Sequence, residues 1–555
     1  MIATCGCREA SSCSRAVNSD SATSASEVRF AEPTKAWEWF FLVAMTACLL
    51  ISTVWQTRKE FLGHDELFTS ILASNPNYGE MFQAVRRGGE LNPPLYFTLE
   101  WLIARVAGNG DLAMRALSGF SVTAAAWVLF FALRPLAGRR LAALGVMLII
   151  GLGRDVFMFM NTARYYGWLF LLVALGVAVV LRLSAGGPVR GRGLLAVFLV
   201  NCALVYTHLY GCFYSGMLFV ALFASDWLRR EIRWKVFGTW LAAWATFLAW
   251  IPTTLQQIRS VTVGVWTPPG YYTLGFFISE LGLDAPVALI VMLIILLGAL
   301  VMVCNSRCAA GSELDRIHAP LGWTALALVA LALMSVPVGT WCISMVRQPP
   351  LYMRRYIFPC TAAWVLMTTL LLITVYRLRD VKPIFQRRVS PFVANAAWCL
   401  VLLFCLIFQP MRAKKNPPRP ASAYTDVDYG FKNLPMVFEG SWGFVHRVVY
   451  GEGRRYLLLI DRDAADASTG WYTKCMERFF QAWNPKYQKA EVARCKDLPD
   501  EFLAVDDDTG QTFEWVLPHH AEFQAKLLGT TNAEPAILGQ QRTWLVKRIA
   551  PTESK

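Results

Sequence analysis

The chain has 555 residues, of which 55% are hydrophobic and 17% are charged, and its mean hydropathy is +0.39. A soluble domain of ordinary composition is less apolar, so these values indicate a polytopic membrane protein. The net charge of +14 comes from short Lys and Arg clusters between apolar runs, which argues against a nucleic-acid partner. Cys5-Gly6-Cys7 lacks a second Cys or His pair at zinc spacing, so no zinc finger is expected.

The amino-terminal segment, residues 1–35, is rich in Ser and Ala and has little periodicity, which predicts a disordered cytoplasmic tail. The apolar run from Trp37 to Val54 then approaches the roughly 20 residues that a membrane-spanning helix needs. This run is long for a signal-peptide core, and no convincing cleavage site follows it. We therefore expect a retained helix.

Further apolar runs predict about eleven spanning helices in all over residues 36–409. After the first, they centre near Trp127, Met147, Val173, Leu199, Phe219, Ala243, Leu293, Leu328, Leu366 and Leu402. The segment from Pro93 to Val106 is also apolar, but it is short and contains Glu100 and Arg105. We expect this segment to be an interfacial helix.

Basic clusters occupy alternate connections, which by the positive-inside rule places those connections and the amino terminus in the cytoplasm. The remaining connections then face outward. They hold Asp65-Glu66, Thr162 to Gly167, Thr207 to Tyr210 and Leu351 to Tyr356. The chemically suggestive groups are therefore expected on one outer face.

The composition changes after Pro410, where a stiff, Pro-rich polar linker leads into a soluble domain over residues 410–555. The apolar patterns in this domain predict an α+β fold. The expected strands are Arg447 to Tyr450, Tyr456 to Ile460 and Thr543 to Ile549. The expected helix is Lys474 to Trp483. The same alternation of inward and outward connections places this domain outside the cytoplasm. We therefore expect that Cys475 and Cys495 could form a disulfide there.

Two adjacent carboxylates, Asp65 and Glu66, lie in the predicted first outer loop, residues 56–111. An acid pair near a helix that begins at Pro93-Pro94 suits proton abstraction at the lipid boundary, although a solvated loop is the alternative. Adjacent helical residues diverge by about 100°, so only one of them points into a given cavity. We predict that Asp65 is the base for an acceptor hydroxyl. Three roles remain open for Glu66: orienting the substrate, binding a divalent cation, or pairing with a nearby Arg.

Four arginines at outward helix ends predict an anion site. They are Arg115, Arg164, Arg354 and Arg355. A polyprenyl phosphate or diphosphate leaving group requires cationic stabilisation, and Arg supplies paired N–H donors for phosphate oxygens. The alternative for each residue is a guanidinium that extends to the lipid headgroups.

Two further features have competing interpretations. His208 lies near the outer end of an apolar helix, where it is either a hydrogen-bonded core residue or part of a functional cavity. The aromatic segment Val265 to Tyr272 either stacks on a sugar or belongs to an interfacial aromatic belt, which we prefer.

Several outward-facing segments of this chain resemble those of the GT-C membrane glycosyltransferases, both in their order along the sequence and in the membrane face they share. The resemblance is closest to the protein mannosyltransferase and lipid A aminoarabinose transferase superfamily. The branch is the RgtA/B/C/D-like one, similar to dolichyl-phosphate-mannose-protein mannosyltransferases. The resemblance covers Trp37 to Tyr376. It is carried by Asp65-Glu66, Pro93-Pro94-Leu95-Tyr96, Arg115-Ala116-Leu117-Ser118, Ala163-Arg164-Tyr165-Tyr166-Gly167, Thr207-His208-Leu209-Tyr210 and Arg355-Tyr356.

The resemblance implies an all-α GT-C fold and inverting sugar transfer from a polyprenyl-phosphate donor to a glycan, lipid or protein hydroxyl, with Asp65 as base. No cofactor is certain. Whether a divalent cation binds is left open, with Asp65 and Glu66 as its candidate ligands. The expected substrate-binding residues are Asn92, Arg115, Arg164, Tyr165, His208, Arg354 and Arg355. Aminoarabinose transferases have Lys where this chain has Asn92, and an acidic residue where it has Arg164-Tyr165-Tyr166.

We therefore expect a multi-pass enzyme of a bacterial inner or plasma membrane, with its active site on the extracytoplasmic face. A transporter or flippase of lipid-linked sugars is the alternative function. No inverted repeat or paired broken helices are visible in the two halves, and the polar groups collect at one face rather than at the midplane. These patterns favour the enzyme.

Overall fold

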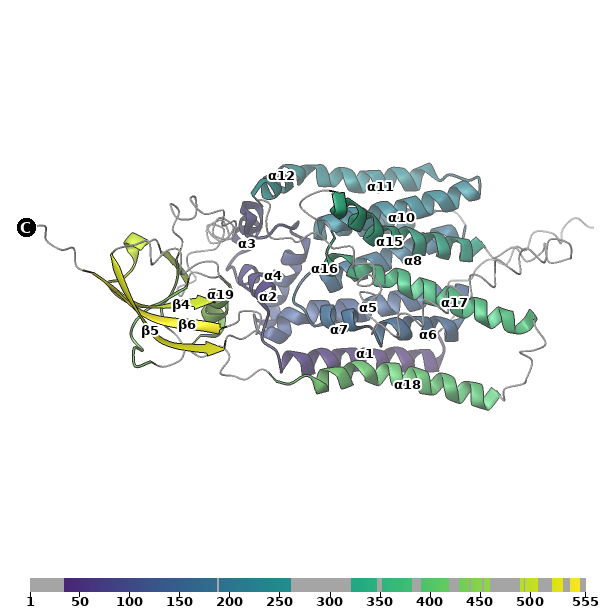
Figure 1. The fold of residues 1–555 in the computed structure, drawn as a ribbon. Helices are drawn as coiled ribbons and strands as arrows, with labels where there is room; N and C mark the ends of the chain where they lie inside the picture. Colours follow the sequence, from purple (N-terminus) through teal and green to yellow (C-terminus); the bar gives the residue numbers. More distant parts are fainter. Residues whose placement is uncertain are drawn as a thin grey trace, which may run out of the picture.

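The structure is a computed structural model that describes residues 34–186, 189–260, 321–346, 352–381, 391–418, 429–438, 441–451, 454–459, 490–493, 495–507, 522–532 and 540–549. A bundle of long apolar helices forms most of the molecule. A smaller domain built on a β-sheet lies against one end of this bundle (Figure 1).

Seven helical spans in the described part of the chain are long and apolar enough to cross a bilayer. They are α1 (Ala36–Thr57), α5 (Asp111–Ala137), α8 (Tyr166–Ser184), α10 (Leu209–Leu228), α15 (Leu321–Val346), α16 (Arg354–Ile357) with α17 (Thr361–Val381), and α18 (Pro391–Lys415). Two bent pairs raise the number to nine if each pair is one span. These pairs are α6 (Arg139–Ile150) with α7 (Arg154–Met160), and α11 (Trp234–Thr246) with α12 (Ile251–Ser260).

These spans confirm a polytopic helical membrane protein. The predicted helix around Leu199 is α9 (Gly191–Thr207), an apolar helix of 17 residues. The predicted helix around Leu293, the aromatic segment Val265 to Tyr272 and most of the amino-terminal tail lie outside the described residues.

The first loop between spans contains four short helical segments. They are α2 (His64–Ala73), α3 (Tyr78–Ala84), the π-helical turn η2 (Val85–Gly89) and α4 (Leu95–Ala107). The predicted interfacial helix corresponds to α4, whose 13 residues rise only about 20 Å and so fall short of the hydrocarbon thickness. All four segments lie at the end of the bundle that adjoins the β-sheet domain (Figure 1).

A close approach between α5 and the start of α8 fixes the turn in front of α8. A Cβ atom on Gly167 would lie 2.9 Å from the Ser118 carbonyl oxygen, so a larger residue would force the two helices apart. The Ser118 hydroxyl also donates to the Arg164 carbonyl at 3.0 Å. Gly167 and Ser118 therefore position the segment that contains Arg164.

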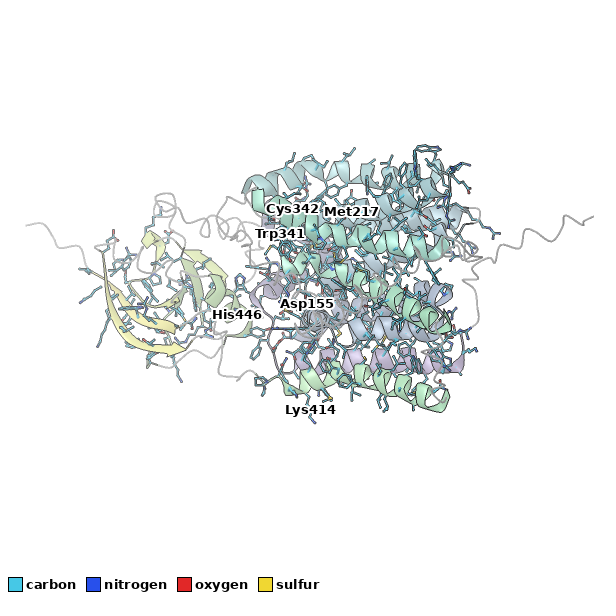
Figure 2. The ribbon with its side chains drawn as sticks, turned by 45° about the vertical axis from the view of Figure 1, so that its right-hand side comes forward. Asp155, Met217, Trp341, Cys342, Lys414 and His446 are labelled. Atoms are coloured by element: carbon cyan, nitrogen blue, oxygen red, sulfur yellow. The ribbon has the colours of Figure 1, made fainter. Side chains whose placement is uncertain are left out.

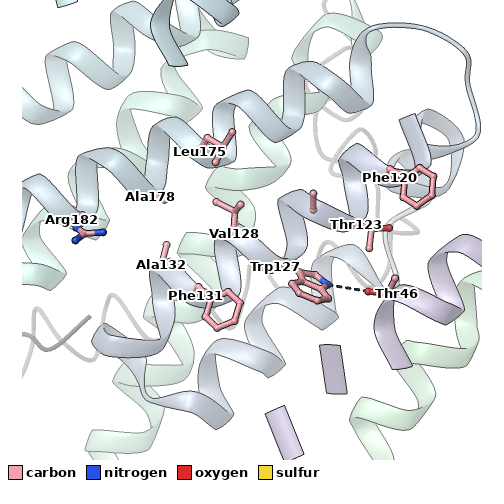
Figure 3. A pocket seen from close by; sticks show the side chains of 11 residues that line it. Thr46, Phe120, Thr123, Trp127, Val128, Phe131, Ala132, Leu175, Ala178 and Arg182 are labelled. Atoms are coloured by element: carbon pink, nitrogen blue, oxygen red, sulfur yellow. Dashed lines mark hydrogen bonds between the residues drawn. The ribbon is translucent and has the colours of Figure 1, made fainter. Parts of the chain in front are cut away.

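An apolar groove with a volume of about 660 Å³ runs between α1, α5 and α8 (Figure 3). Its lining residues are Thr46, Phe120, Thr123, Ala124, Trp127, Val128, Phe131, Ala132, Leu175, Ala178 and Arg182. The Trp127 indole N–H donates to the Thr46 hydroxyl at 3.0 Å, which fixes one wall. None of the predicted site residues lines this groove.

The carboxy-terminal domain is an α+β structure, as predicted. Its six-stranded sheet has the order β3-β2-β1-β4-β6-β5, in which β1 to β4 pair in parallel and β5 and β6 pair antiparallel. The strands are β1 (Met436–Phe438), β2 (Tyr456–Leu459), β3 (Ala490–Ala493), β4 (Glu501–Asp507), β5 (Phe523–Asn532) and β6 (Gln540–Arg548). The strands β2 and β6 match two of the predicted ones.

The predicted strand from Arg447 to Tyr450 is wrong, because these residues end helix α19 (Ser441–Tyr450). Phe444, Val445 and Val448 are buried at helical spacing, and a short apolar run does not distinguish this pattern from a strand. The predicted helix from Lys474 to Trp483 and the proposed Cys475–Cys495 disulfide lie outside the described side chains.

Candidate functional site

Asp65 lies in the first turn of α2, where it faces an arginine that is 290 residues later in the sequence. Arg355, in α16, donates from Nη1 to Asp65 Oδ2 at 2.6 Å. The Nδ1 atom of His64 is 3.8 Å from Asp65 Oδ1. The Asp65 side chain is 42% exposed, so its carboxylate is anchored by protein and open to a substrate.

Glu66 has a different environment, although it is the next residue. Its two oxygens accept bonds of 3.1 Å from the Nε and Nη2 atoms of Arg115, which is almost completely buried. They also accept 2.6 Å bonds from the backbone N–H groups of Gly63 and Ala163. Four donors thus surround one buried carboxylate, and of the interpretations left open by the sequence, this geometry favours a structural partner of Arg115.

Arg164 joins the turn before α8 to the first loop. Its Nη1 atom is 2.6 Å from Glu90 Oε2 and 3.2 Å from both the Asp65 carbonyl and the Thr69 hydroxyl. Glu90 also accepts a 3.2 Å bond from the Asn92 side chain. Arg164 therefore brings the loop segment around Asn92 next to the backbone of Asp65.

Arg354 forms an ion pair with Asp155, at the start of α7 and within the bundle (Figure 2). A second bond joins Arg354 Nε to Asp155 Oδ2 at 3.3 Å. The pair fixes α16 against the bend between α6 and α7. Consequently Arg354 and its neighbour Arg355 are held by different acids, Asp155 and Asp65.

His208 and Tyr165 belong to a buried aromatic cluster beneath the polar site. The His208 ring lies 4.5 Å from the Tyr165 ring and 4.7 Å from the Tyr356 ring. Its Nδ1 atom accepts a 3.0 Å bond from the backbone N–H of Tyr210 and so caps α10. With 3% exposure, His208 has the surroundings of a hydrogen-bonded core residue. Tyr165 also packs under Arg164, whose guanidinium carbon is 5.1 Å from the ring centre.

Electrostatics keeps Asp65 ionised. Burial alone would raise the pKa of Asp65, but the neighbouring His64 imidazole and the positive charges of Arg164 and Arg355 outweigh it. The pKa of this carboxyl is therefore well below its usual range. Burial also lowers the pKa of the neighbouring His64, which favours a neutral imidazole.

A second carboxyl near the site behaves in the opposite way. Glu100, in α4, is fully buried, and its Oε1 atom accepts a 2.6 Å bond from the Tyr96 hydroxyl. The Oε2 atom has no hydrogen-bond partner among the described residues. Burial raises the pKa of Glu100 from 4.5 to about 8, so at neutral pH this group is mostly protonated.

The acid pair does not fit a shared cation site. Glu66 turns toward Arg115, whereas Asp65 turns toward Arg355. Within the described ranges, no three His, Cys, Asp or Glu side chains gather as metal ligands.

The structure thus brings all nine predicted site residues to the loop end of the bundle. Sequence reasoning missed the acids that pair with them, chiefly Glu90 and Asp155. Both offered a weak local signal, since Glu90 follows Gly88-Gly89 and Asp155 follows Gly153-Arg154. Among the site carboxylates, Glu66, Glu90 and Asp155 are at most 11% exposed, so Asp65 is the accessible one.

Comparison with known proteins gives a structural match without a sequence match. No family model matches the chain, and no curated protein sequence matches it. The crystal structure of ArnT from Cupriavidus metallidurans bound to undecaprenyl phosphate aligns with 92% of this chain and 98% of its own, at a TM-score of 0.52 and 11% identity. The apo structure of the same protein gives a TM-score of 0.53 at 12% identity, with the same coverage.

The archaeal oligosaccharyltransferase AglB from Archaeoglobus fulgidus also aligns, in complex with an inhibitory peptide and a dolichol-phosphate. This alignment covers 85% of the chain and 70% of AglB, at 10% identity and a TM-score of 0.45. The alignment with ArnT extends over the bundle and the β-sheet domain, and it shows that this chain has the fold of the GT-C membrane glycosyltransferases.

Proposed function

We propose that the protein is an integral membrane glycosyltransferase that moves a sugar from a polyprenyl-phosphate donor to a hydroxyl of an envelope glycan, lipid or protein. The observation that carries the proposal is Asp65, an accessible carboxylate held between Arg355 and His64. Its surroundings supply both elements of the reaction, a base for a hydroxyl and cations for a phosphate. The fold shared with ArnT, crystallised with undecaprenyl phosphate, supports a lipid-linked donor.

In the proposed reaction, Asp65 accepts the proton of the acceptor hydroxyl as its oxygen attacks the anomeric carbon. The bond between that carbon and the donor phosphate oxygen breaks, so polyprenyl phosphate leaves with the bonding electron pair. Attack opposite to the leaving group inverts the anomeric centre. The added charge on the phosphate requires cations rather than a strong acid, and Arg354 and Arg355 are the proposed partners.

Asp65 is a weak base while Arg355 neutralises it, since its pKa is low. A donor phosphate that binds Arg355 would draw this guanidinium away from Asp65 and add negative charge nearby. Both effects raise the proton affinity of Asp65. We therefore propose that donor binding activates the base, with Arg355 shared between Asp65 and the phosphate.

The remaining predicted residues have supporting roles in this proposal. Arg164 and Asn92 organise the first loop through Glu90, while Arg115 and Glu66 fix the start of α2. Tyr165 and His208 form the aromatic floor. Of these six residues, Asn92 and Arg164 are proposed to contact the donor directly, and the other four act through the shape of the site.

The donor arm of the proposal has a direct test. Arg354→Ala and Arg355→Ala should raise the KM for the lipid donor more than that for the acceptor, and Arg→Lys should rescue only part of the loss. Arg58→Ala, at the loop end of α1, is the matched control. Unchanged donor kinetics in the single and double variants would leave both arginines with a structural role.

The reaction itself is tested with purified protein and a panel of polyprenyl-phosphate sugars, with mass spectrometry of the products. Loss of one sugar from the envelope glycans of a deletion strain would name the donor and narrow the acceptor. A transporter or flippase would move lipid-linked sugar between leaflets without forming a new glycosidic bond. Product formation therefore separates the two functions.

We also propose that the site faces the extracytoplasmic side of a bacterial inner or plasma membrane, because Arg139 and Arg140 follow the end of α5, and Arg229 and Arg230 the end of α10, that lies away from the first loop. Reporter fusions after Arg140, Arg192 and Lys555 test this topology. Activity of the last fusion in the cytoplasm would contradict it.

The carboxy-terminal domain lies on the same side as Asp65, and we propose that it presents the acceptor. A truncation that ends at Arg412 should keep donor binding and lose transfer to the natural acceptor. A folded truncation that transfers at the full rate would refute this role.

A further inference from the structure

Tyr450, the last residue of α19, reaches from the carboxy-terminal domain into the first loop. Its hydroxyl accepts a 2.9 Å bond from the backbone N–H of Leu62 and donates a 3.0 Å bond to Asp111 Oδ1. The Tyr450 ring also lies 4.8 Å from the ring of Phe61. One phenol thus contacts the loop through its ring and uses both its donor and an acceptor position.

The peptide unit between Phe61 and Leu62 is consequently held at both of its polar atoms. Arg115 Nη2 donates to the Phe61 carbonyl at 2.8 Å, while Tyr450 receives the Leu62 N–H. A planar peptide that is fixed at both atoms cannot rotate without breaking a bond. Gly63, the N-cap residue of α2, follows directly, and Asp65 lies in the first turn.

The two clamping residues are themselves connected. Asp111 begins α5, and Arg115 lies four residues later on the same helix, one turn away. Tyr450 therefore binds the turn of α5 whose arginine holds Glu66 and Phe61. The carboxy-terminal domain, the start of α5 and the start of α2 form one hydrogen-bonded unit.

Apolar contacts reinforce this unit. Leu62, Leu67 and Ile71 of the loop belong to the same buried cluster as Phe444 and Val445 of α19. All five side chains are at most 2% exposed. The ring centres of His64 and His446 are 6.5 Å apart, and Figure 2 shows His446 on the side of its domain that faces the bundle. The domain is thus packed onto α2 and is more than a tethered neighbour.

We propose that Tyr450 is a positioning residue for sugar transfer, which sets the orientation of the Asp65 carboxylate by clamping the Phe61–Leu62 peptide from the carboxy-terminal domain. This inference rests on the proposed function of Asp65. It assigns the domain a part in the geometry of the base, which is separate from any role in acceptor presentation.

The test is Tyr450→Phe in the full-length protein, which keeps the ring against Phe61 and removes both hydrogen bonds. Loss of a bond worth about 1.4 kcal/mol in the transition state corresponds to a fall of about tenfold in kcat, with the donor KM within about twofold of wild type. Tyr429→Phe, in the same domain, is the matched control and should leave kcat unchanged. Hydrogen exchange supplies a second readout, because the Leu62 amide should exchange about tenfold faster in Tyr450→Phe.

The outcomes separate this inference from the function on which it rests. If Asp65→Asn abolishes transfer while folded Tyr450→Phe keeps the wild-type kcat and Leu62 exchange rate, the positioning role is refuted. If Asp65→Asn keeps its turnover, the proposed function itself is wrong. Should Tyr450→Phe fail to fold, Asp111→Ala removes the acceptor that orients the Tyr450 hydroxyl. A wild-type kcat together with a wild-type Leu62 exchange rate in that variant would also refute the proposal.

Discussion

The Nη1 atom of Arg355 donates a 2.6 Å hydrogen bond to Asp65 Oδ2, across a separation of 290 residues in the sequence. This contact joins the first loop to the short helix that precedes α17. It lowers the proton affinity of Asp65 and occupies a guanidinium that is also suited to a phosphate. Asp65 is therefore expected to gain its proton as Arg355 changes partner during the reaction.

Asp65→Asn tests the base directly. The amide keeps the size of the side chain but cannot accept a proton, so turnover should fall by about 10²- to 10⁴-fold, the usual contribution of a positioned base. The measurement is product formation by the purified variant under single-turnover conditions. Its thermal transition should stay close to that of wild type, and near-normal turnover would show that another group is the base.

The pH dependence of kinetics tests whether donor binding activates Asp65. The acid limb of kcat/KM reports the free enzyme, in which the pKa of Asp65 is low, so this limb should lie at acidic pH. The limb of kcat reports the bound complex and should lie at higher pH, because the phosphate competes for Arg355. In Arg355→Gln the acid limbs of kcat and kcat/KM should lie closer to each other than in wild type. Coincident limbs in wild type would contradict a shared guanidinium.

Glu66→Gln should lower the stability of the protein more than Asp65→Asn does. The substitution leaves the buried guanidinium of Arg115 without a counter-charge, and breaking one partner of a buried pair typically costs about 3–5 kcal/mol. Thermal unfolding in detergent checks this expectation. The control is Glu501→Gln, which breaks an exposed ion pair with Lys547 and should cost no more than about 1 kcal/mol. Equal effects of the two substitutions would show that the Glu66–Arg115 pair contributes little.

Hydropathy and charge alone predicted the architecture of the bundle, because membrane-spanning helices must bury their backbone and expose apolar side chains. The common face of Asp65, Arg164 and Arg355 also followed from the parity of the spans. Which acid each arginine would meet did not follow. The Arg164–Glu90 and Arg354–Asp155 pairs join residues 74 and 199 positions apart, and such pairs depend on how the helices pack.

The role of Tyr450 was hidden by an error in secondary structure. The residues predicted as a strand, Arg447 to Tyr450, end the helix α19, whose Phe444, Val445 and Val448 share a buried cluster with α2. The apolar residues in this segment fit both periods, so the pattern could not separate them. Contact with the first loop, which buries one side of the segment, selects the helix.

Glu100 predicts how the stability of the protein depends on pH. Its pKa is about 8 in the folded protein and 4.5 in the ordinary, solvated state, so the folded state retains a proton that the unfolded state loses. The resulting stabilisation is complete below about pH 4.5, decreases as the pH rises, and is lost above about pH 8. At higher pH the protein must bury a carboxylate whose Oε2 atom has no hydrogen-bond partner among the described residues.

Glu100→Gln should remove this dependence, because the amide is neutral at every pH and can still accept the bond from Tyr96. The variant should therefore unfold at a temperature at least about 2 °C above that of wild type at pH 8.5, with a smaller difference at pH 5. Scanning calorimetry at matched protein and detergent concentrations measures both values, and Glu501→Gln corrects for the general effect of removing an acid. Parallel pH profiles for wild type and Glu100→Gln would mean that Glu100 is ionised throughout this range, and that the folded protein supplies it with a counter-charge.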